Sequence, residues 1–253
     1  MELTYLDSNS WLIEMAGKRI LLDPWLVGSL IFGNAPWLFK GDRPEDREIP
    51  ADIDLILLSQ GLEDHAHPET LKILDKTLPV VCSPNGQAIA EKYGYQTIHS
   101  LPHGGVFTCD NLEIRAVKGS PVGPTTLENG YILTDLETNK TLYYEPHGYH
   151  SEELKQFAPI DVVVTPLINL KLPLLGAVIK GQETALKVCD WLKPKAILPT
   201  AAGGDVHFDG FLMNFLKPDG TVQDFAEMLA AKQVGTKVIE PEPGKAIALL
   251  NEP

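Results

Sequence analysis

A short apolar run leads directly into a cluster of acidic and imidazole side chains at residues 54–67, DLILLSQGLEDHAH. Residues 54–58 have the length and composition of a buried strand, and no spacer separates them from the polar turn that follows. The turn contains Glu63, Asp64, His65 and His67. A buried strand therefore delivers carboxylates and imidazoles to its own C-terminal end, and this constrains both the fold and the chemistry.

The rest of the chain alternates between short strands and a few amphipathic helices. Residues 11–15 and 19–23 indicate a β-hairpin with Gly17 in its turn. Pro68 is typical of a helix start and places His67 at or near the N-cap, and residues 182–192 predict a helix that ends before Lys193-Pro194. Strands followed by strand–helix alternation predict an α+β protein, a four-layer αββα sandwich of two mixed sheets flanked by helices. We expect one domain over residues 1–253.

The composition of the chain disfavours two classes of partner and bears on its cellular location. The net charge of −13 disfavours nucleic acid and anionic membrane surfaces, because the long-range field repels both. The 3 cysteines are far apart and show no CxxC spacing, which fits a reducing compartment. The first residues lack a basic segment followed by an apolar one, and no run approaches the length of a membrane helix. The chain is therefore expected to be soluble and cytoplasmic.

The passage at 54–67 resembles the signature of the metallo-β-lactamase superfamily, a buried strand ending in Thr-His-x-His-x-Asp-His before a helix. Ser59 takes the place of the Thr, and Gln60 and Leu62 take the places of the first two His. Asp64 and His65 match the final Asp-His. Leu cannot ligate zinc and a Gln amide is a poor substitute for imidazole. The order of elements along nearly the whole chain resembles the ascorbate-6-phosphate-lactonase-like branch of these hydrolases, which implies the same sandwich fold.

Further positions follow from the same resemblance. The superfamily's next His would fall in VKGSPVGP, where Ser120 is the nearest polar residue, and its last His falls on Ala201. Its bridging Asp falls on His147, beside Glu145 in LYYEPHGYH. The resemblance also implies a supporting role near the metal for Asp23 of ILLDPWL, although Asp-Pro by itself is a common turn.

These residues predict an altered metal site. Asp64, His65 and His147 are the predicted ligands, with His67 as a further candidate, and Asp64 and Glu145 are the predicted catalytic carboxylates. The cofactor would be one zinc or another divalent metal, or none if the same side chains only hydrogen-bond to one another. The prediction depends on the turn after Leu58 facing the turn after Tyr144 across one opening.

Two functional hypotheses remain open from the sequence. The first is metal-dependent hydrolysis of a small ester, lactone or phosphoester. The alternative is a non-catalytic relative that binds a small molecule or a protein in the same cleft. The apolar run at 167–179 is either an exposed homodimer contact or a buried connection. Residues 28–50 are irregular. The aromatic residues within or just before this loop either form a wall over a pocket or pin the loop to the core, and they are Trp25, Phe32, Trp37 and Phe39.

Overall fold

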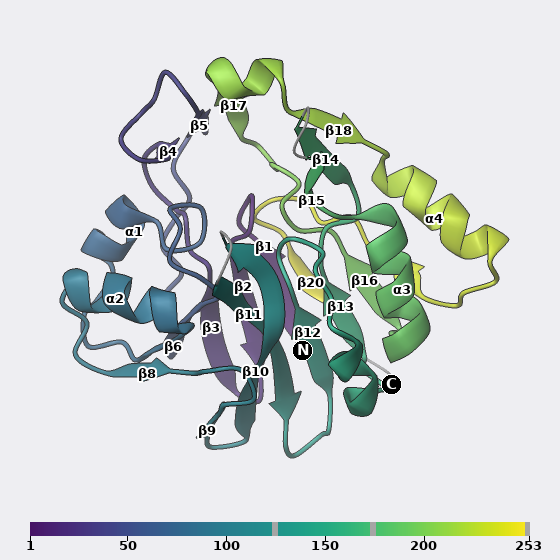
Figure 1. Cartoon of the computed structure of the whole chain (residues 1–253). Helices are drawn as coiled ribbons and strands as arrows, with labels where there is room; N and C mark the ends of the chain where they lie inside the picture. Colours follow the sequence, from purple (N-terminus) through teal and green to yellow (C-terminus); the bar gives the residue numbers. More distant parts are fainter. Residues whose placement is uncertain (123–125, 173–175, 251–253) are drawn as a thin grey trace.

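Two large mixed sheets pack face to face between two pairs of helices. The structure, a computed structural model, describes residues 1–122, 126–172 and 176–250. In Figure 1 helices α1 (Pro68–Ile73) and α2 (Pro84–Lys92) cover the outside of one sheet, while α3 (Gln182–Leu192) and α4 (Val222–Ala231) cover the outside of the other. This is the predicted four-layer αββα sandwich, and the α+β fold class is confirmed.

The first sheet has 7 strands in the order β20-β1-β2-β3-β6-β7-β8. Its strands are β20 (Ala246–Ala248), β1 (Glu2–Tyr5), β2 (Trp11–Met15), β3 (Lys18–Leu22), β6 (Leu55–Leu58), β7 (Val80–Cys82) and β8 (Ile98–Ser100). The predicted hairpin is β2 and β3, and Gly17 turns it with a φ of 70° that L-residues rarely adopt. From β3 to β8 the strands run parallel, so β3 and β6 end at the same edge.

The second sheet has 7 strands in the order β19-β16-β13-β12-β11-β10-β9. Its strands are β19 (Lys237–Val238), β16 (Ala196–Leu198), β13 (Val162–Val164), β12 (Thr141–Tyr144), β11 (Thr126–Asp135), β10 (Leu112–Val122) and β9 (Val106–Cys109). Strands β12, β13, β16 and β19 are parallel. Both sheets therefore bring the C-terminal ends of parallel strands to one edge of the sandwich, the position at which sites in such sheets are built.

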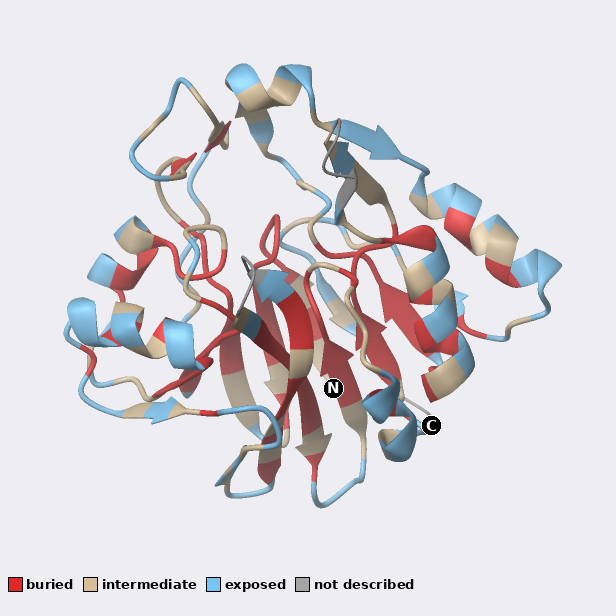
Figure 2. Cartoon of the chain, viewed as in Figure 1, coloured by how far each residue is buried: buried red, intermediate tan, exposed pale blue. Residues whose placement is uncertain are grey.

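Three apolar cores hold the layers together. The core between the sheets contains Trp11, Ile20 and Tyr144. A second joins the first sheet to α1 and α2 through residues such as Leu58 and Leu71, and a third joins the second sheet to α3 and α4 through residues such as Val163 and Phe225. Figure 2 shows the buried residues concentrated in the strands and on the inner faces of the helices. No helix in the described ranges has the length and apolar character needed to span a bilayer.

Two small sheets stand at the edge where the parallel strands end. One joins β15 (Gly176–Ile179), β14 (Asn169–Leu172) and β18 (Lys217–Asp219), and the other joins β17 (His207–Asp209), β5 (Lys40–Asp42) and β4 (Leu30–Ile31). Two 3-10 helices, η1 (Glu152–Phe157) and η2 (Phe211–Asn214), complete the structure. The segment 28–50, expected to be irregular, thus contributes two short strands to a sheet. The homodimer contact at 167–179 remains a prediction, and residues 173–175 of that run lie outside the described residues.

Candidate metal centre

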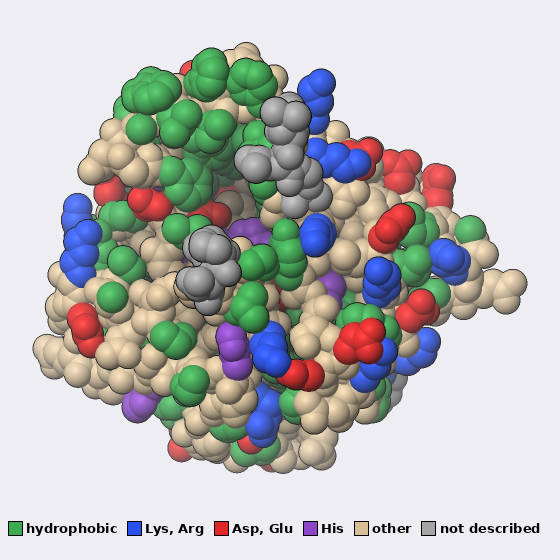
Figure 3. Space-filling model, viewed as in Figure 1, with side chains coloured by type: hydrophobic (Ala, Val, Ile, Leu, Met, Phe, Trp, Pro, Cys, Tyr) green, Lys and Arg blue, Asp and Glu red, His purple; other side chains and the backbone are tan. Residues whose placement is uncertain are grey.

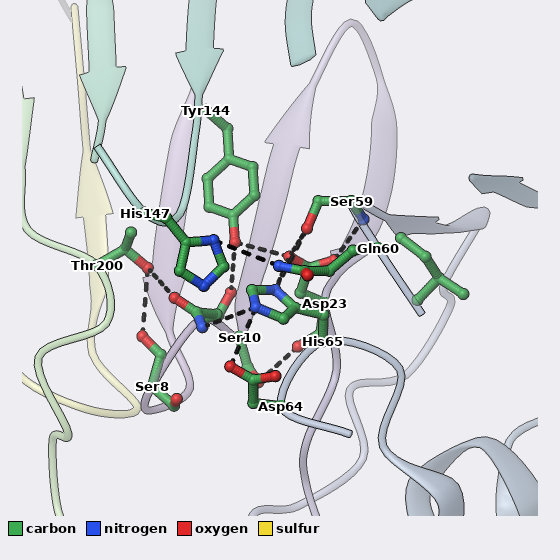
Figure 4. A network of polar contacts seen from close by, with 12 residues as sticks. Ser8, Ser10, Asp23, Ser59, Gln60, Asp64, His65, Tyr144, His147 and Thr200 are labelled. Atoms are coloured by element: carbon green, nitrogen blue, oxygen red, sulfur yellow. Dashed lines mark hydrogen bonds and ion pairs between the residues drawn. The ribbon is translucent and has the colours of Figure 1, made fainter. Parts of the chain in front are cut away.

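Asp23 is the hub of a buried polar network at the edge where β3 and β6 end. Its Oδ1 accepts a hydrogen bond from the backbone N–H of Ser59 at 2.7 Å. Its Oδ2 accepts from Ser59 Oγ at 2.5 Å and from the hydroxyl of Tyr144 at 2.7 Å, and lies 2.7 Å from His65 Nδ1 (Figure 4). Since Tyr144 belongs to the second sheet, this carboxylate ties the two sheets together beside the site. Asp23 is therefore more than an Asp-Pro turn.

His65 lies between two carboxylates. Its Nδ1–H donates to Asp23, and its Nε2 lies 3.1 Å from Oδ2 of Asp64. Burial disfavours the charged imidazole, but the negative charges of Asp64 and Asp23 outweigh burial and raise the pKa of His65 to about 10. Burial likewise opposes the charge of Asp64, and the adjacent His65 lowers the pKa of that carboxyl below its ordinary value. The geometry thus demands a cation between Nε2 and Oδ2, either a proton or a metal ion.

His147 approaches this pair from the second sheet. It lies in the turn after β12, and its ring centroid is 5.1 Å from that of His65. Its Nδ1 is 3.1 Å from Ser120 Oγ and 3.4 Å from Gln60 Nε2. Burial and the positive charge of His65 lower the pKa of His147 to about 4, so this imidazole is neutral near pH 7. With Nδ1 protonated and donating to Ser120, the Nε2 lone pair is available to a metal.

The three side chains fit a divalent metal. Asp64, His65 and His147 each offer a ligand atom, and these atoms all lie within 4.8 Å of one another. Metal–ligand bonds of about 2.1 Å hold ligand atoms about 3 to 4 Å apart, so small side-chain movements would close this triangle around an ion. Oδ1 of Asp64 is buried, and the described part of the chain gives it no hydrogen-bond partner. Two imidazoles and one carboxylate are also the protein ligands of several catalytic zinc and iron sites.

The turn after Leu58 and the turn after Tyr144 therefore lie side by side, as the sequence predicted. Figure 4 shows His147 reaching toward His65 and Asp64 from the opposite sheet. Gln60, which takes the place of a superfamily His, and Ser120, the polar residue nearest to where another would fall, both contact Nδ1 of His147. Ala201 supplies only backbone contact here, its N–H donating to Ser8 O at 2.8 Å.

Glu145, the second predicted catalytic carboxylate, lies at the start of the His147 turn. Its Oε2 accepts hydrogen bonds from the backbone N–H groups of His147 at 3.2 Å and Tyr149 at 2.8 Å. Burial raises the pKa of Glu145 to about 7, although the backbone donors and His65 act in the opposite direction. This contact pattern positions the turn that carries His147. Whether Glu145 also takes part in catalysis remains a prediction.

His67, the further ligand candidate, is placed elsewhere. It is the N-cap of α1, as the sequence predicted, and its Nδ1 accepts the backbone N–H of Thr70 at 3.3 Å. Its Nε2 lies 3.1 Å from the carbonyl of Ser29, to which it donates. Both ring nitrogens are thus occupied, and His67 does not join the three grouped donors.

Sequence reasoning missed two contributors to the centre. Asn9 Nδ2 lies 3.4 Å from His65 Nε2, and Tyr144 hydrogen-bonds Asp23. Asn9 sits in a polar turn between strands, and no spacing signal separates it from an ordinary turn residue. Tyr144 is the last residue of an apolar strand, and only its neighbour Glu145 drew attention to this position.

The comparison that decides the family covers most of the chain. The sequence pattern of the β-lactamase superfamily domain matches residues 2–201. The chain belongs to the β-lactamase superfamily. Among its relatives, a UPF0173 metal-dependent hydrolase of Thermodesulfovibrio yellowstonii is 26% identical over 98% of this chain and 92% of its own length. A UPF0173 metal-dependent hydrolase of Pyrococcus furiosus is 27% identical over 98% of this chain and 100% of its own.

Solved structures agree on the superfamily fold. An isothiocyanate hydrolase from Delia radicum gut bacteria superposes with a TM-score of 0.71 at 19% identity, covering 98% of this chain and 99% of its own. A possible metal-dependent hydrolase from Veillonella parvula gives a TM-score of 0.74 at 13% identity, with 98% and 99% coverage. At these identities the likeness concerns the fold. The chemistry of this β-lactamase superfamily chain must be argued from its own side chains.

Proposed function

We propose that this protein is a metal-dependent hydrolase that holds one divalent ion, zinc or a similar metal, with Asp64, His65 and His147. The observation that carries the proposal is the grouping of these donors, with His65 Nε2 3.1 Å from Asp64 Oδ2 and all three ligand atoms within 4.8 Å. The relatives named metal-dependent hydrolases support the same reaction class. The substrate bond would be that of a small ester, lactone or phosphoester.

The residues around the three proposed ligands orient their side chains toward the site. A divalent ion, when bound, supplies Lewis acidity and brings the pKa of water toward neutrality. Asp23 fixes His65 with Nδ1 protonated, so that Nε2 points at the site. Ser120 does the same for His147 through its Nδ1. Oδ1 of Asp64 is the atom we assign to accept a proton from the attacking water, since its partner oxygen Oδ2 faces His65.

The experiment compares metal content, thermal stability and ester hydrolysis. The purified protein, after dialysis, should contain about one zinc, manganese or iron per chain, and a chelator should lower its melting temperature. His147→Ala should lose the metal and lower hydrolysis by more than about 100-fold. His99→Ala is the matched control, because His99 is an exposed histidine outside the group of ligands. It lies on the edge strand β8, and its ring centroid is 4.7 Å from that of Phe107 on the edge strand β9. A protein without stoichiometric metal, and whose melting temperature does not respond to added metal, would refute the proposal.

A further inference from the structure

Exposed and half-buried aromatic side chains gather on one side of the candidate metal centre. We call this set the aromatic rim, and it consists of Phe32, Trp37, Phe39, Phe208, Phe211 and Phe215. Trp37 is 71% exposed and Phe211 is 54% exposed. In Figure 3 hydrophobic side chains cover the region of β17 and β5, above a hollow in which a histidine side chain is visible. Contiguous apolar surface of this kind on a soluble protein usually marks a binding site.

The aromatic rim is built by two segments that are far apart in the sequence. Strand β5 pairs with β17, and the backbone N–H of Phe211 donates to the carbonyl of Trp37 at 2.9 Å. Ring centroids of Phe39 and Phe208 lie 5.5 Å apart, and those of Phe32 and Phe39 lie 5.2 Å apart. Ring contacts between the segments therefore fix the rim, while Trp37 and Phe211 keep most of their surface in water.

Hydrogen bonds connect the aromatic rim to the turn that carries the metal ligands. The backbone N–H of Gly33, next to Phe32, donates to Glu63 Oε1 at 3.1 Å, and Glu63 immediately precedes Asp64. On the other side of Phe32, the carbonyl of Ser29 accepts from His67. Leu62, in the same turn as Glu63 and Asp64, is 38% exposed and adds apolar surface to this turn. The segment that carries Phe32 is therefore hydrogen-bonded to the residues that flank Asp64 and His65.

The charges around this opening favour an uncharged ligand. The net charge is −13, and the turn hydrogen-bonded to Gly33 carries Glu63 and Asp64. Lys40 of β5 is paired with Asp42 at 2.8 Å. Arg47, in the same loop segment, is held by Asp7, with Nε to Oδ2 at 2.7 Å. An anionic group over the rim would meet repulsion, whereas a neutral apolar group would cover aromatic surface that is otherwise in water.

From this geometry we infer the substrate class: an uncharged ester or lactone with a linear alkyl or aryl group that lies against Trp37 and Phe211 while its carbonyl faces Asp64, His65 and His147. The inference rests on the proposed hydrolase function and specifies its substrate. A buried methylene contributes enough to raise kcat/KM roughly threefold to fourfold, so longer chains react faster until the rim is covered.

The test measures kcat/KM of the metal-loaded protein on p-nitrophenyl acetate, butyrate, hexanoate and octanoate. We expect kcat/KM to rise with chain length, and mono-p-nitrophenyl adipate, with its terminal carboxylate, to react at least tenfold more slowly than the hexanoate. Trp37→Ala combined with Phe211→Ala should abolish the dependence of kcat/KM on chain length. Trp37→Phe combined with Phe211→Leu should retain the dependence.

The matched control is Leu136→Ala. Leu136 is 46% exposed and follows β11, at the end of the second sheet opposite the His147 turn. Its substitution should leave the chain-length dependence unchanged. Rates that do not vary with chain length in the wild type, or a dependence that survives in the double Ala variant, would overturn the inference and leave the hydrolase proposal intact.

A binding measurement separates the two proposals. Titration of the protein with 2-butanone, 2-hexanone and 2-octanone, which cannot be hydrolysed, is followed by intrinsic tryptophan fluorescence. Dissociation constants that fall roughly threefold per methylene in the wild type, but not in the double Ala variant, support binding at the aromatic rim even if no ester is cleaved.

Light scattering tests whether the aromatic rim is instead a contact between two copies of the chain. If the double Ala variant converts a dimer to a monomer and keeps the chain-length dependence, the rim is a subunit interface and the inference is wrong.

Discussion

Asp23 and His65 are 42 positions apart in the sequence, yet Asp23 Oδ2 lies 2.7 Å from His65 Nδ1 in the buried interior. The carboxylate orients the imidazole, so that its other nitrogen faces Asp64. Carboxylate–histidine pairs of this kind fix the tautomer of metal-binding histidines and strengthen their binding. Four predictions follow from this network and from the turns beside it.

The first prediction concerns Asp23→Asn. It keeps the size of the side chain but removes the charge that His65, Ser59 and Tyr144 share. We expect metal affinity to fall about 10- to 100-fold and the free energy of unfolding to fall by about 2 to 4 kcal/mol. Competition with a fluorescent chelator measures the affinity, and urea unfolding measures the stability.

Asp135→Asn is the matched control for that variant. Asp135 is also buried and also accepts several hydrogen bonds, from Glu137 N, Thr138 N and Thr138 Oγ1, but it caps the turn after β11. Its substitution should lower stability and leave metal affinity unchanged. Wild-type metal affinity in Asp23→Asn would contradict the orienting role.

The second prediction compares Tyr144→Phe with Tyr143→Phe. Both hydroxyls are buried, but Tyr144 donates to Asp23 at 2.7 Å, whereas Tyr143 lies 3.0 Å from His150 Nδ1 on the helix side of the same sheet. Each variant should lose about 1 kcal/mol of unfolding free energy. Only Tyr144→Phe should also weaken metal binding severalfold. Calorimetric titration measures the metal affinity of both variants. Equal affinities would contradict a role of the Tyr144–Asp23 hydrogen bond in metal binding.

The third prediction is a loss of stability in acid that depends on His150. Burial lowers the pKa of His150 to about 3, while the unfolded chain takes up the same proton near its ordinary pKa of 6.5. The stabilising contribution is therefore present above pH 6.5 and is lost as the pH falls toward 3. At pH 4.5 the loss is about 2 to 3 kcal/mol relative to pH 7. Urea unfolding in the presence of a chelator measures the stability of His150→Asn at both pH values. This variant should not lose the 2 to 3 kcal/mol that the wild type loses through His150. The same pH dependence in variant and wild type would contradict the prediction.

The fourth prediction has the opposite sign and concerns Glu145. Its pKa is raised to about 7 from 4.5, so between these values the unfolded chain releases a proton that the folded chain keeps. The contribution is present below pH 4.5 and is lost as the pH rises through 7. Glu145→Gln cannot ionise and keeps an oxygen to accept from the turn. We measure the free energy of unfolding of Glu145→Gln minus that of the wild type. This difference should be about 3 kcal/mol more positive at pH 8 than at pH 4.

A control for Glu145→Gln is Glu48→Gln, which changes an exposed glutamate. Its stability should follow the wild type across the same pH range in urea unfolding. If both glutamate variants behave alike, the buried carboxyl is not the source of the effect. Because the contributions of His150 and Glu145 have opposite slopes between about pH 4.5 and 6.5, His150→Asn and Glu145→Gln should shift the pH dependence of stability in opposite directions relative to the wild type.

Local signals in the sequence were sufficient for the elements that frame the site. The hairpin at Gly17, the capping by His67 before Pro68, and the helix Gln182–Leu192 all depend on neighbouring residues, and the structure confirms them. The meeting of the two turns followed from the strand order that the superfamily resemblance implied. The sequence therefore groups Asp64, His65 and His147, and in the structure their ligand atoms lie within 4.8 Å of one another.

The contacts that make the site work were beyond the sequence. Tyr144 and Asp23 are 121 positions apart, and their hydrogen bond depends on how the two sheets pack. Strands β4 and β5, of 2 and 3 residues, are too short for a hydrophobic period, so the small sheet beneath the aromatic rim gave no signal. The aromatic residues in and just before 28–50 fit neither interpretation alone. Trp25 is buried in the core, whereas Trp37 is exposed.

The hydroxyl of Tyr144 on Asp23, together with the indole of Trp11 donating to Thr200 at 3.1 Å, ties the halves of the sandwich at the very place where the ligands meet. Amide protons of residues beside these ties should exchange with deuterium only when the whole chain unfolds, because separating the halves also dismantles the centre. An ion bound by ligands from both sheets would link the two halves. It would slow unfolding and shift the equilibrium toward the folded state.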